Sequence, residues 1–372
     1  MKNVLFLLFS LVFGQIVAQT PHLHTHDRVI RFPNVPGYLT LKCDFHQHSI
    51  FSDGNVHPDI RVQEAARDSL DAISLTEHLE YQPHKDDIPH PDRNRSYELA
   101  QVLSASANVL VVRGAEITRN MPPGHTNAIF IEDANKLLIK DSVEVFREAN
   151  RQGAFVFWNH PNWTAQRKDG VARLTDLHKK FIAEKLLHGI EVVNEFTYSD
   201  EALQIALDNN LTIMGTSDIH GLIDWDYKVA EGGHRPVTLV FAKERTEGSI
   251  KEGLVNRRTV VWFNNTLIGR EEHLVPLLKS SIVVEKASYV GSSSIAEVTF
   301  KNNSDAEFIL LNKSAYTLHQ NTDVVVLHPN ASTTVAVKTL QQFADFDLRF
   351  VVLNGITAPQ THPEMVWKVK VE

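Results

Sequence analysis

Residues 39–54 read LTLKCDFHQHSIFSDG, an apolar run that leads into two histidines and a short turn. The run before His46 is typical of a β-strand. Because His46 and His48 are two residues apart, both imidazoles point the same way on an extended chain and can bind one metal ion. On its own a His-x-His pair is a weak signal, and Ser52-Asp53-Gly54 alone could be an ordinary turn. The rest of the chain has to decide between these interpretations.

Further apolar runs follow and alternate with amphipathic helical stretches such as Pro58 to Leu70 and Asp141 to Gln152. This alternation is typical of a βα fold with a parallel sheet or barrel. We expect an α/β domain over residues 38–270, a distorted (β/α)7-type barrel. Its strands are Leu39 to Phe45, Ala72 to Thr76, Val109 to Gly114, Ala154 to Trp158, Gly189 to Val193 and Leu211 to Gly215.

From residue 280 the pattern changes to short alternating runs separated by Asn, Ser and Pro turns. This predicts a small antiparallel β-sandwich over residues 280–372. Its histidines are His319, His328 and His362, and their spacing is not that of metal ligands. We interpret them as surface residues, and we expect packing or attachment to be the role of this domain.

The chain has 372 residues, and 37 basic against 45 acidic residues give it a net charge of -8. This balance argues against nucleic acid as a partner, because a phosphate backbone attracts a broad basic surface. Cys43 is its single cysteine, so thiolate metal sites and internal disulfides are excluded. Any metal site must therefore use histidines and carboxylates.

The N-terminus is typical of a secretory signal peptide, with Lys2 before a short apolar run and a cleavage site after Ala18. A membrane anchor or a buried strand are the alternatives, but the run is shorter than the roughly 20 residues that span a bilayer. We expect a signal peptide over residues 1–18 and an N-terminal arm over 19–37. The mature protein is then periplasmic or secreted, without a membrane span.

Residues of the types that bind metals follow one predicted strand after another. In a βα barrel the C-terminal ends of the strands meet at one mouth, so side chains far apart in sequence come together there. The alternative, that each histidine independently stabilises its own loop, would have to hold at every strand end. The residues concerned are Glu77 and His78, Glu116, His160, and Asp218 with His220.

Over roughly residues 41–267 the sequence resembles the polymerase and histidinol phosphatase (PHP) superfamily of metal-dependent phosphoesterases. The resemblance lies in the combination of motifs. The matching segments are His46-x-His48 with Ser52-Asp53-Gly54, Thr76-Glu77-His78, Glu116, His125, His160 and Asp218-x-His220. Glu77 stands where many members have aspartate, which leaves the role of this carboxylate open.

The resemblance implies two or three divalent transition-metal ions, with manganese or zinc preferred and iron a further candidate. It also implies hydrolysis by a hydroxide that bridges two metals, with Glu116, Asp218 and His78 in the catalytic roles. The implied metal sets are His46, His48, Glu116 and Asp218; then Glu116, His125 and His160; and then Asp53, His78 and His220.

The expected function is hydrolysis of small phosphodiesters, or of monoesters, by an exported phosphoesterase. A metal-dependent amidohydrolase and a non-catalytic metal-dependent binding protein are the alternatives. For the phosphate we expect basic residues in the loops near the strand ends, with Trp163 as a wall of the pocket. These residues are Arg93, Arg95, Arg119, His234 and Arg235.

Overall fold

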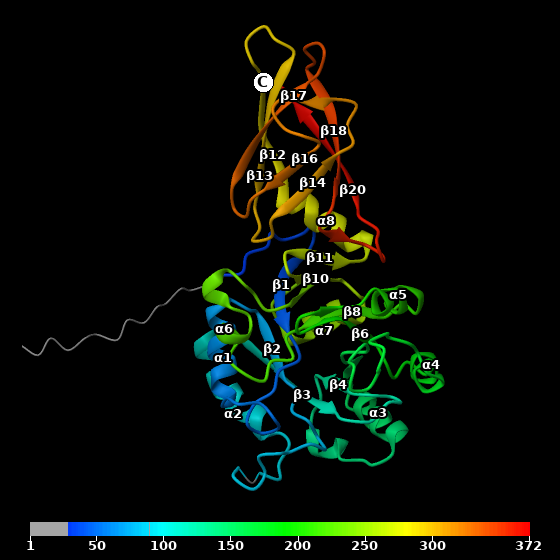
Figure 1. Ribbon diagram of the computed structural model, residues 1–372. Coiled ribbons are helices and arrows are strands. Elements are labelled where there is room, and N and C mark those ends of the chain that lie inside the picture. The colour runs from blue at the N-terminus through cyan, green and yellow to red at the C-terminus, as the bar shows by residue number, and fades with distance from the viewer. Residues whose placement is uncertain (1–28, 89) are drawn as a thin grey trace, which may run out of the picture.

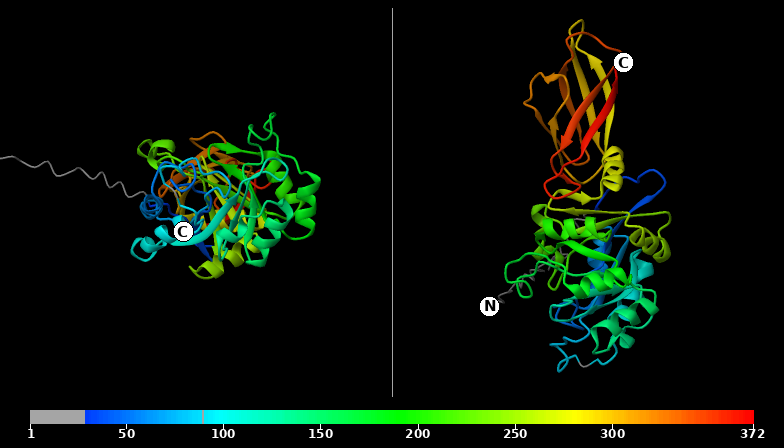
Figure 2. Two further views of the ribbon diagram at one scale, coloured as in Figure 1. Left: turned by 90° about the horizontal axis from the view of Figure 1, so that it is seen from below. Right: turned by 90° about the vertical axis from the view of Figure 1, so that its right-hand side faces the viewer.

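The computed structural model describes residues 29–88 and 90–372. An α/β part built on one large sheet and an antiparallel β part lie end to end, so the molecule is elongated (Figures 1 and 2). The predicted signal peptide (1–18) and residues 19–28 of the predicted arm lie outside the described residues. None of the helices in the described part is long and apolar enough to cross a membrane.

A curled sheet of 12 strands forms the α/β part, in the order β19-β11-β10-β9-β1-β2-β3-β4-β5-β6-β7, and β8 also pairs with β6. The six predicted strands are all present, with bounds within a few residues of the expected ones. They are β1 (Leu39–Asp44), β2 (Ala72–Leu75), β3 (Leu110–Ile117), β5 (Phe155–Trp158), β6 (Gly189–Asn194) and β8 (Thr212–Thr216).

Several strands run antiparallel, which a simple βα repeat does not predict. β4 (Thr126–Ile129) pairs antiparallel with both β3 and β5. The link from β3 to β4 is shorter than the dozen or so residues that a parallel crossover requires, so the chain must turn back. The other added strands are β7 (Thr197–Tyr198), β9 (Val237–Ala242), β10 (Thr259–Phe263) and β11 (Thr266–Gly269).

Helices cover the sheet on its outer side (Figure 1). In α3 (Ser142–Arg151) the predicted N-cap is confirmed, since the Asp141 carboxylate accepts from the backbone N–H groups of Val143 and Glu144. The other helices are α1 (Pro58–Arg67), α2 (Arg95–Ala107), α4 (Asp176–Ala183), α5 (Asp200–Asp208), α6 (Ile223–Asp226) and α7 (Glu247–Val255), with short 3-10 helices at Ala134–Leu137 and Val229–Glu231.

The C-terminal part is a sandwich of two four-stranded sheets, with orders β12-β13-β17-β15 and β16-β14-β18-β20. Alternating burial along its strands places side chains such as Phe300, Phe308 and Trp367 between the sheets. Its strands are β12 (Ile282–Tyr289), β13 (Ile295–Asn302), β14 (Phe308–Asn312), β15 (Thr317–Leu318), β16 (Val324–Leu327), β17 (Ser332–Lys338), β18 (Asp345–Val352) and β20 (Glu364–Lys370). The predicted order of an α/β domain followed by a β-sandwich is confirmed.

The two parts share a hydrogen-bonded strand as well as the helix between them, α8 (Glu271–Ser281). β19 (Gly355–Ile356), from the C-terminal part of the chain, pairs parallel with β11 of the large sheet. Next to it the Asn354 side chain donates to the carbonyls of Asn265 and Glu307. These contacts attach the sandwich directly to the edge of the sheet.

Candidate metal centre

His46 and His48, which follow β1, lie side by side and are fully buried. Their Nε2 atoms are 3.1 Å apart, and each is 3.0 Å from Oδ1 of Asp218. The turn that follows needs a glycine, because a Cβ on Gly54 would lie 2.7 Å from the backbone carbon of His48. The Ser-Asp-Gly segment is thus a tight turn, and it also brings Asp53 back toward the histidines.

Outer hydrogen bonds orient three histidines of the cluster. Nδ1 of His46 donates to Glu191, Nδ1 of His48 to the Ser52 hydroxyl, and Nδ1 of His220 to the Asp218 carbonyl. In a neutral ring that donates from Nδ1, Nε2 carries no proton, and in all three rings Nε2 faces the cluster. Metal-binding histidines are oriented in this way.

Glu116 is the centre of the cluster and is fully buried at the end of β3. One carboxylate oxygen lies 2.6 Å from Nδ1 of His125 and 3.9 Å from Nε2 of His160. The other lies 2.9 Å from Nδ1 of His78, and 3.6 and 3.4 Å from the first two histidines. A single carboxylate therefore faces five histidines, as a ligand shared between two metal ions would.

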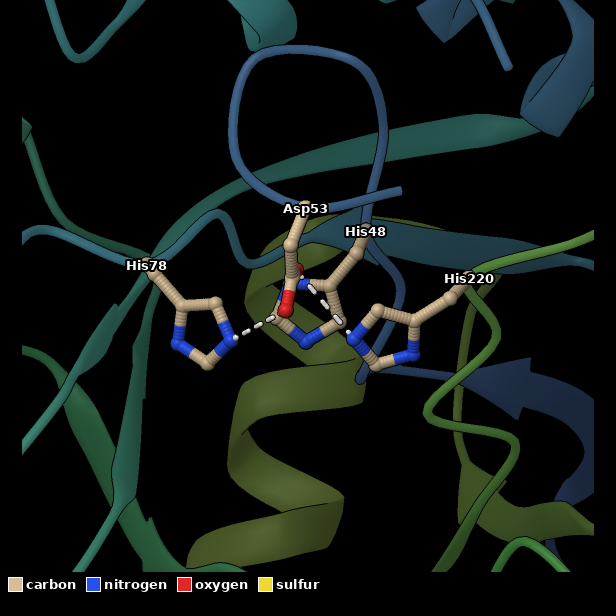
Figure 3. A group of neighbouring side chains, drawn as sticks. All are labelled: His48, Asp53, His78 and His220. Carbon is tan, nitrogen blue, oxygen red and sulfur yellow. Dashed lines mark ion pairs between the residues drawn. The ribbon is translucent and has the colours of Figure 1, made fainter. Parts of the chain in front are cut away.

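Asp53 forms a second focus with His48, His78 and His220 (Figure 3). Its carboxylate lies between two rings, 3.3 Å from Nε2 of His78 and 3.2 Å from Nε2 of His220. The ring of His48 stacks between the same two histidines, with centroids 4.5 and 4.4 Å away. One carboxylate and three imidazoles thus converge from three loops.

Two predicted ligands occupy strained backbone positions. The backbone angle φ is 28° at His160 and 48° at Asp218, values that residues other than glycine seldom adopt. Such strain is concentrated at functional sites, where the surrounding structure holds the residue in place. Here it turns both side chains from the ends of β5 and β8 into the cluster.

The charges in the cluster suit cation binding. Burial alone would raise the pKa of Glu116, but the charge of His78 and the close approach of His125 and His46 lower it well below its usual range. Burial likewise opposes ionisation of Asp218, and His46 and His48 outweigh it and lower its pKa. Burial and the charge of His78 lower the pKa of His48 to about 3. The carboxylates are therefore ionised and His48 is neutral, which are the states that bind metals.

The unpartnered atoms test whether the residues fit metal ions. Several buried oxygen and nitrogen atoms that could bind a metal lie close together, and none makes a hydrogen bond of good geometry to a described residue. They include both oxygens of Glu116, Oδ1 of Asp53, Oδ1 of Asp218 and Nδ1 of His125. Buried polar atoms are normally hydrogen-bonded, so such a group indicates another binding partner. Imidazole and carboxylate donors fit divalent transition metals.

All nine residues of the implied metal sets lie in this one region, although the groupings differ in detail. One group is Asp53, His78 and His220, as implied, with His48 added. Another has His46, His48 and Glu116 without Asp218, and a third has His78 beside Glu116 and His125 in place of His160. His160 lies farther out, with Nε2 4.0 Å from Asp218.

Two carboxylates act around the cluster in ways that the sequence analysis missed. Glu191 accepts hydrogen bonds from His46, the His160 backbone, Asn194 and Thr216. Its signal was a charged residue within the apolar run 189–193. Glu77, whose role was open, does not face the cluster and instead binds the Ser49 and Ser52 hydroxyls, which holds the turn before Asp53.

The predicted phosphate-binding residues are not in the site, and this part of the prediction needs correction. Arg235 is 1% exposed and pairs with Asp44 and Asp68. Arg93 donates to the carbonyls of Leu79 and His90. The remaining three also have other partners. Arg95 pairs with Glu98, Arg119 pairs with Glu80 and donates to the Ile139 carbonyl, and the His234 ring stacks on Trp262. These basic residues follow strand ends in the sequence, but their side chains stabilise loops and do not enter the site.

A cavity of about 140 Å³ opens over the cluster. Trp163 lines it, as predicted, with its ring 5.5 Å from that of His125 and 5.1 Å from that of His160. Asn194 and Glu195 complete the wall together with the candidate ligands. Burial and the nearby Asp218 carboxylate raise the pKa of Glu195.

Comparison with known proteins supports the two-part architecture. Residues 282–368 match the model of a family described as an Ig-like domain. A crystal structure from Bacteroides vulgatus, described as a two-domain protein containing a predicted PHP-like metal-dependent phosphoesterase, is 44% identical with a TM-score of 0.86. That match covers 92% of this chain and 98% of the other.

Two further solved structures are each 16% identical to this chain. One, a putative metal-dependent phosphoesterase from Bifidobacterium adolescentis, covers 50% of this chain and 90% of its own, with a TM-score of 0.39. The other, an amidohydrolase from Chromobacterium violaceum, covers 48% and 87%, with a TM-score of 0.35. Likenesses at this level carry no conclusion about function. No curated protein matches the chain.

Proposed function

Because the chain belongs to the two-domain PHP-like metal-dependent phosphoesterases, we propose that it hydrolyses small phosphodiesters, or monoesters. The observation that carries this proposal is the position of Glu116, whose two buried oxygens face histidines on both sides without hydrogen-bond geometry. A shared carboxylate of this kind is what a site for two adjacent metal ions requires.

The residues that would hold the ions are the nine of the cluster. When bound, divalent ions supply the charge that activates a water for attack and that neutralises the phosphoryl oxygens. Glu116 and Asp218 lie nearest His46 and His48 and would hold an ion with them, and Asp53 would hold another with His78 and His220. The donor set is compatible with manganese, zinc or iron, and we propose manganese or zinc.

The chain's own residues position the reacting groups. Hydrogen bonds from Nδ1 of His46, His48 and His220 orient these rings so that Nε2 of each faces the cluster. Trp163 lines the cavity and contacts the rings of His125 and His160. A small cavity above a dense set of ligands suits an ester of modest size.

A substrate panel tests this function. Metal-reconstituted protein should hydrolyse bis-para-nitrophenyl phosphate or para-nitrophenyl phosphate, and should not hydrolyse matched amides or lactones. Turnover of the amides or lactones alone would favour an amidohydrolase. Phosphate binding without turnover would favour a non-catalytic binding protein.

Export is a separate proposal, supported by the basic and apolar pattern of residues 1–18. The mass of the mature protein purified from its native cells tests it. Loss of the first 18 residues is the expected result, and an intact N-terminus in a cytoplasmic fraction would contradict it.

A further inference from the structure

The cavity wall beyond the candidate ligands has an unusual composition for a phosphate site. It consists of one aromatic side chain, Trp163, one amide, Asn194, and one carboxyl group, Glu195. Among the described residues that line this cavity, none is lysine or arginine. The positive charge for one phosphoryl group would come from the metal ions, and a second anionic group would meet no positive side chain in this wall.

The basic side chains of the surrounding loops do not fill this gap. Arg119 is held by Glu80 and by the Ile139 carbonyl, and Arg93 by backbone carbonyls of its own loop. Arg235 is buried between two aspartates. Moving any of them to the cavity would break these bonds, and for Arg235 it would leave buried carboxylates unpaired, which is costly.

Two exposed aromatic side chains contact rings of candidate ligands. The Trp163 side chain is 45% exposed although it contacts the rings of two candidate ligands. Tyr81 is 52% exposed and meets the His78 ring edge-on at 5.7 Å. Exposed aromatic surface beside a cavity is favourable for stacking a flat ring of a ligand.

We propose that the substrates are esters with a single phosphoryl group and a flat, uncharged organic group, which packs on Trp163. Esters with a second phosphate or a carboxylate are rejected, because Glu195 and the absence of a positive side chain in the wall disfavour them. This inference rests on the proposed function, since it takes for granted that the phosphoryl group binds at the metal cluster.

Calorimetry with three phosphonates, which are not hydrolysed, separates the two claims. We use methylphosphonate, phenylphosphonate and 4-carboxyphenylphosphonate with the metal-loaded protein. Phenylphosphonate should bind about tenfold more tightly than methylphosphonate, the size of effect expected for one stacked ring. The carboxylated compound should lose that gain.

Variants identify the residues responsible. In Trp163→Ala the advantage of phenylphosphonate over methylphosphonate should disappear, because the ring on which the phenyl group stacks is gone. Trp225→Ala, which removes another exposed tryptophan outside this cavity, is the matched control and should keep the advantage. In Glu195→Lys the carboxylated compound should bind at least as tightly as phenylphosphonate.

The outcomes are distinguishable. The substrate class would be overturned if wild type bound phenylphosphonate no more tightly than methylphosphonate. It would also be overturned if wild type bound 4-carboxyphenylphosphonate more tightly than phenylphosphonate. Either result would leave the phosphoesterase function standing. Failure of all three phosphonates to bind, together with no ester hydrolysis, would instead contradict the proposed function itself.

Discussion

Nδ1 of His46 donates a hydrogen bond of 2.8 Å to the fully buried carboxylate of Glu191, 145 residues later in the chain. The same carboxylate also accepts from the His160 backbone and from Thr216. Asn194, a further donor to it, also donates to Asp218. Glu191 therefore connects the ends of β1, β5, β6 and β8 without being a candidate ligand itself.

Glu191→Gln should weaken metal binding about 10- to 100-fold, the usual cost of losing a partner that orients a ligand. The physical reason is that an amide has only one accepting oxygen, whereas two oxygens here receive four donors. Titration of apo-protein with zinc and a competing chelator measures the affinity. Asp71→Asn, directly before β2 and thus at the other end of this strand from His78, is the control, and equal affinities in the two variants would contradict the role of Glu191.

Glu116→Gln keeps the shape of the side chain but removes the shared charge. We expect it to reduce the bound metal and to lower turnover by more than the 10- to 100-fold range of an outer partner, about 1000-fold or beyond. Metal counting and diester hydrolysis on the same sample measure both. The exposed Glu297→Gln in the sandwich is the matched control. Full metal content with normal turnover in Glu116→Gln would refute the shared-ligand assignment.

Arg235→Met should lower the free energy of unfolding by about 3–5 kcal/mol, because Asp44 and Asp68 would remain buried without their cation. Urea denaturation measures this loss, and the KM of the folded protein should not change. Arg95→Met, at an exposed pair, should alter neither. A raised KM with unchanged stability in Arg235→Met would restore this arginine to the substrate site.

His178 should make the protein sensitive to mild acid. Burial lowers the pKa of His178 from 6.5 to about 4, and its ring accepts from the Thr175 N–H and donates to the Pro123 carbonyl in the neutral form. Because the unfolded state binds the proton first, stability is present above pH 6.5 and is lost as the pH falls toward 4. A shift of this size is worth about 3 kcal/mol.

Thermal unfolding between pH 7 and pH 4 checks this dependence in wild type, His178→Gln and the exposed-site control His319→Gln. The His178 variant should have a flatter pH profile and the control the wild-type profile. The same slope in all three proteins would assign the acid sensitivity to other groups.

The strands and the cluster residues were predictable from sequence because they are local patterns repeated at successive strand ends. His46 and His48 share a face of an extended chain, and His78, Glu116 and Asp218 each follow an apolar run. Convergence of strand ends then brings them together whatever their separation in sequence. The antiparallel direction of β4 follows instead from the short link between β3 and β4, which cannot form a parallel crossover.

The roles of the arginines were not predictable, because a sequence gives the charge of a side chain but not its partner. Arg235 meets Asp44 and Asp68, which are 191 and 167 residues away. Glu191 was missed for the same reason, since its partners come from three other strand ends. Long-range pairing of this kind depends on the packing of the sheet and not on the local pattern.

Metal content of the untagged protein, measured beside bis-para-nitrophenyl phosphate hydrolysis before and after chelation, tests the central claim most directly. The account predicts about two to three divalent transition-metal ions per chain, loss of turnover on chelation, and recovery with manganese or zinc. No bound metal, and no turnover after either ion is added, would contradict it.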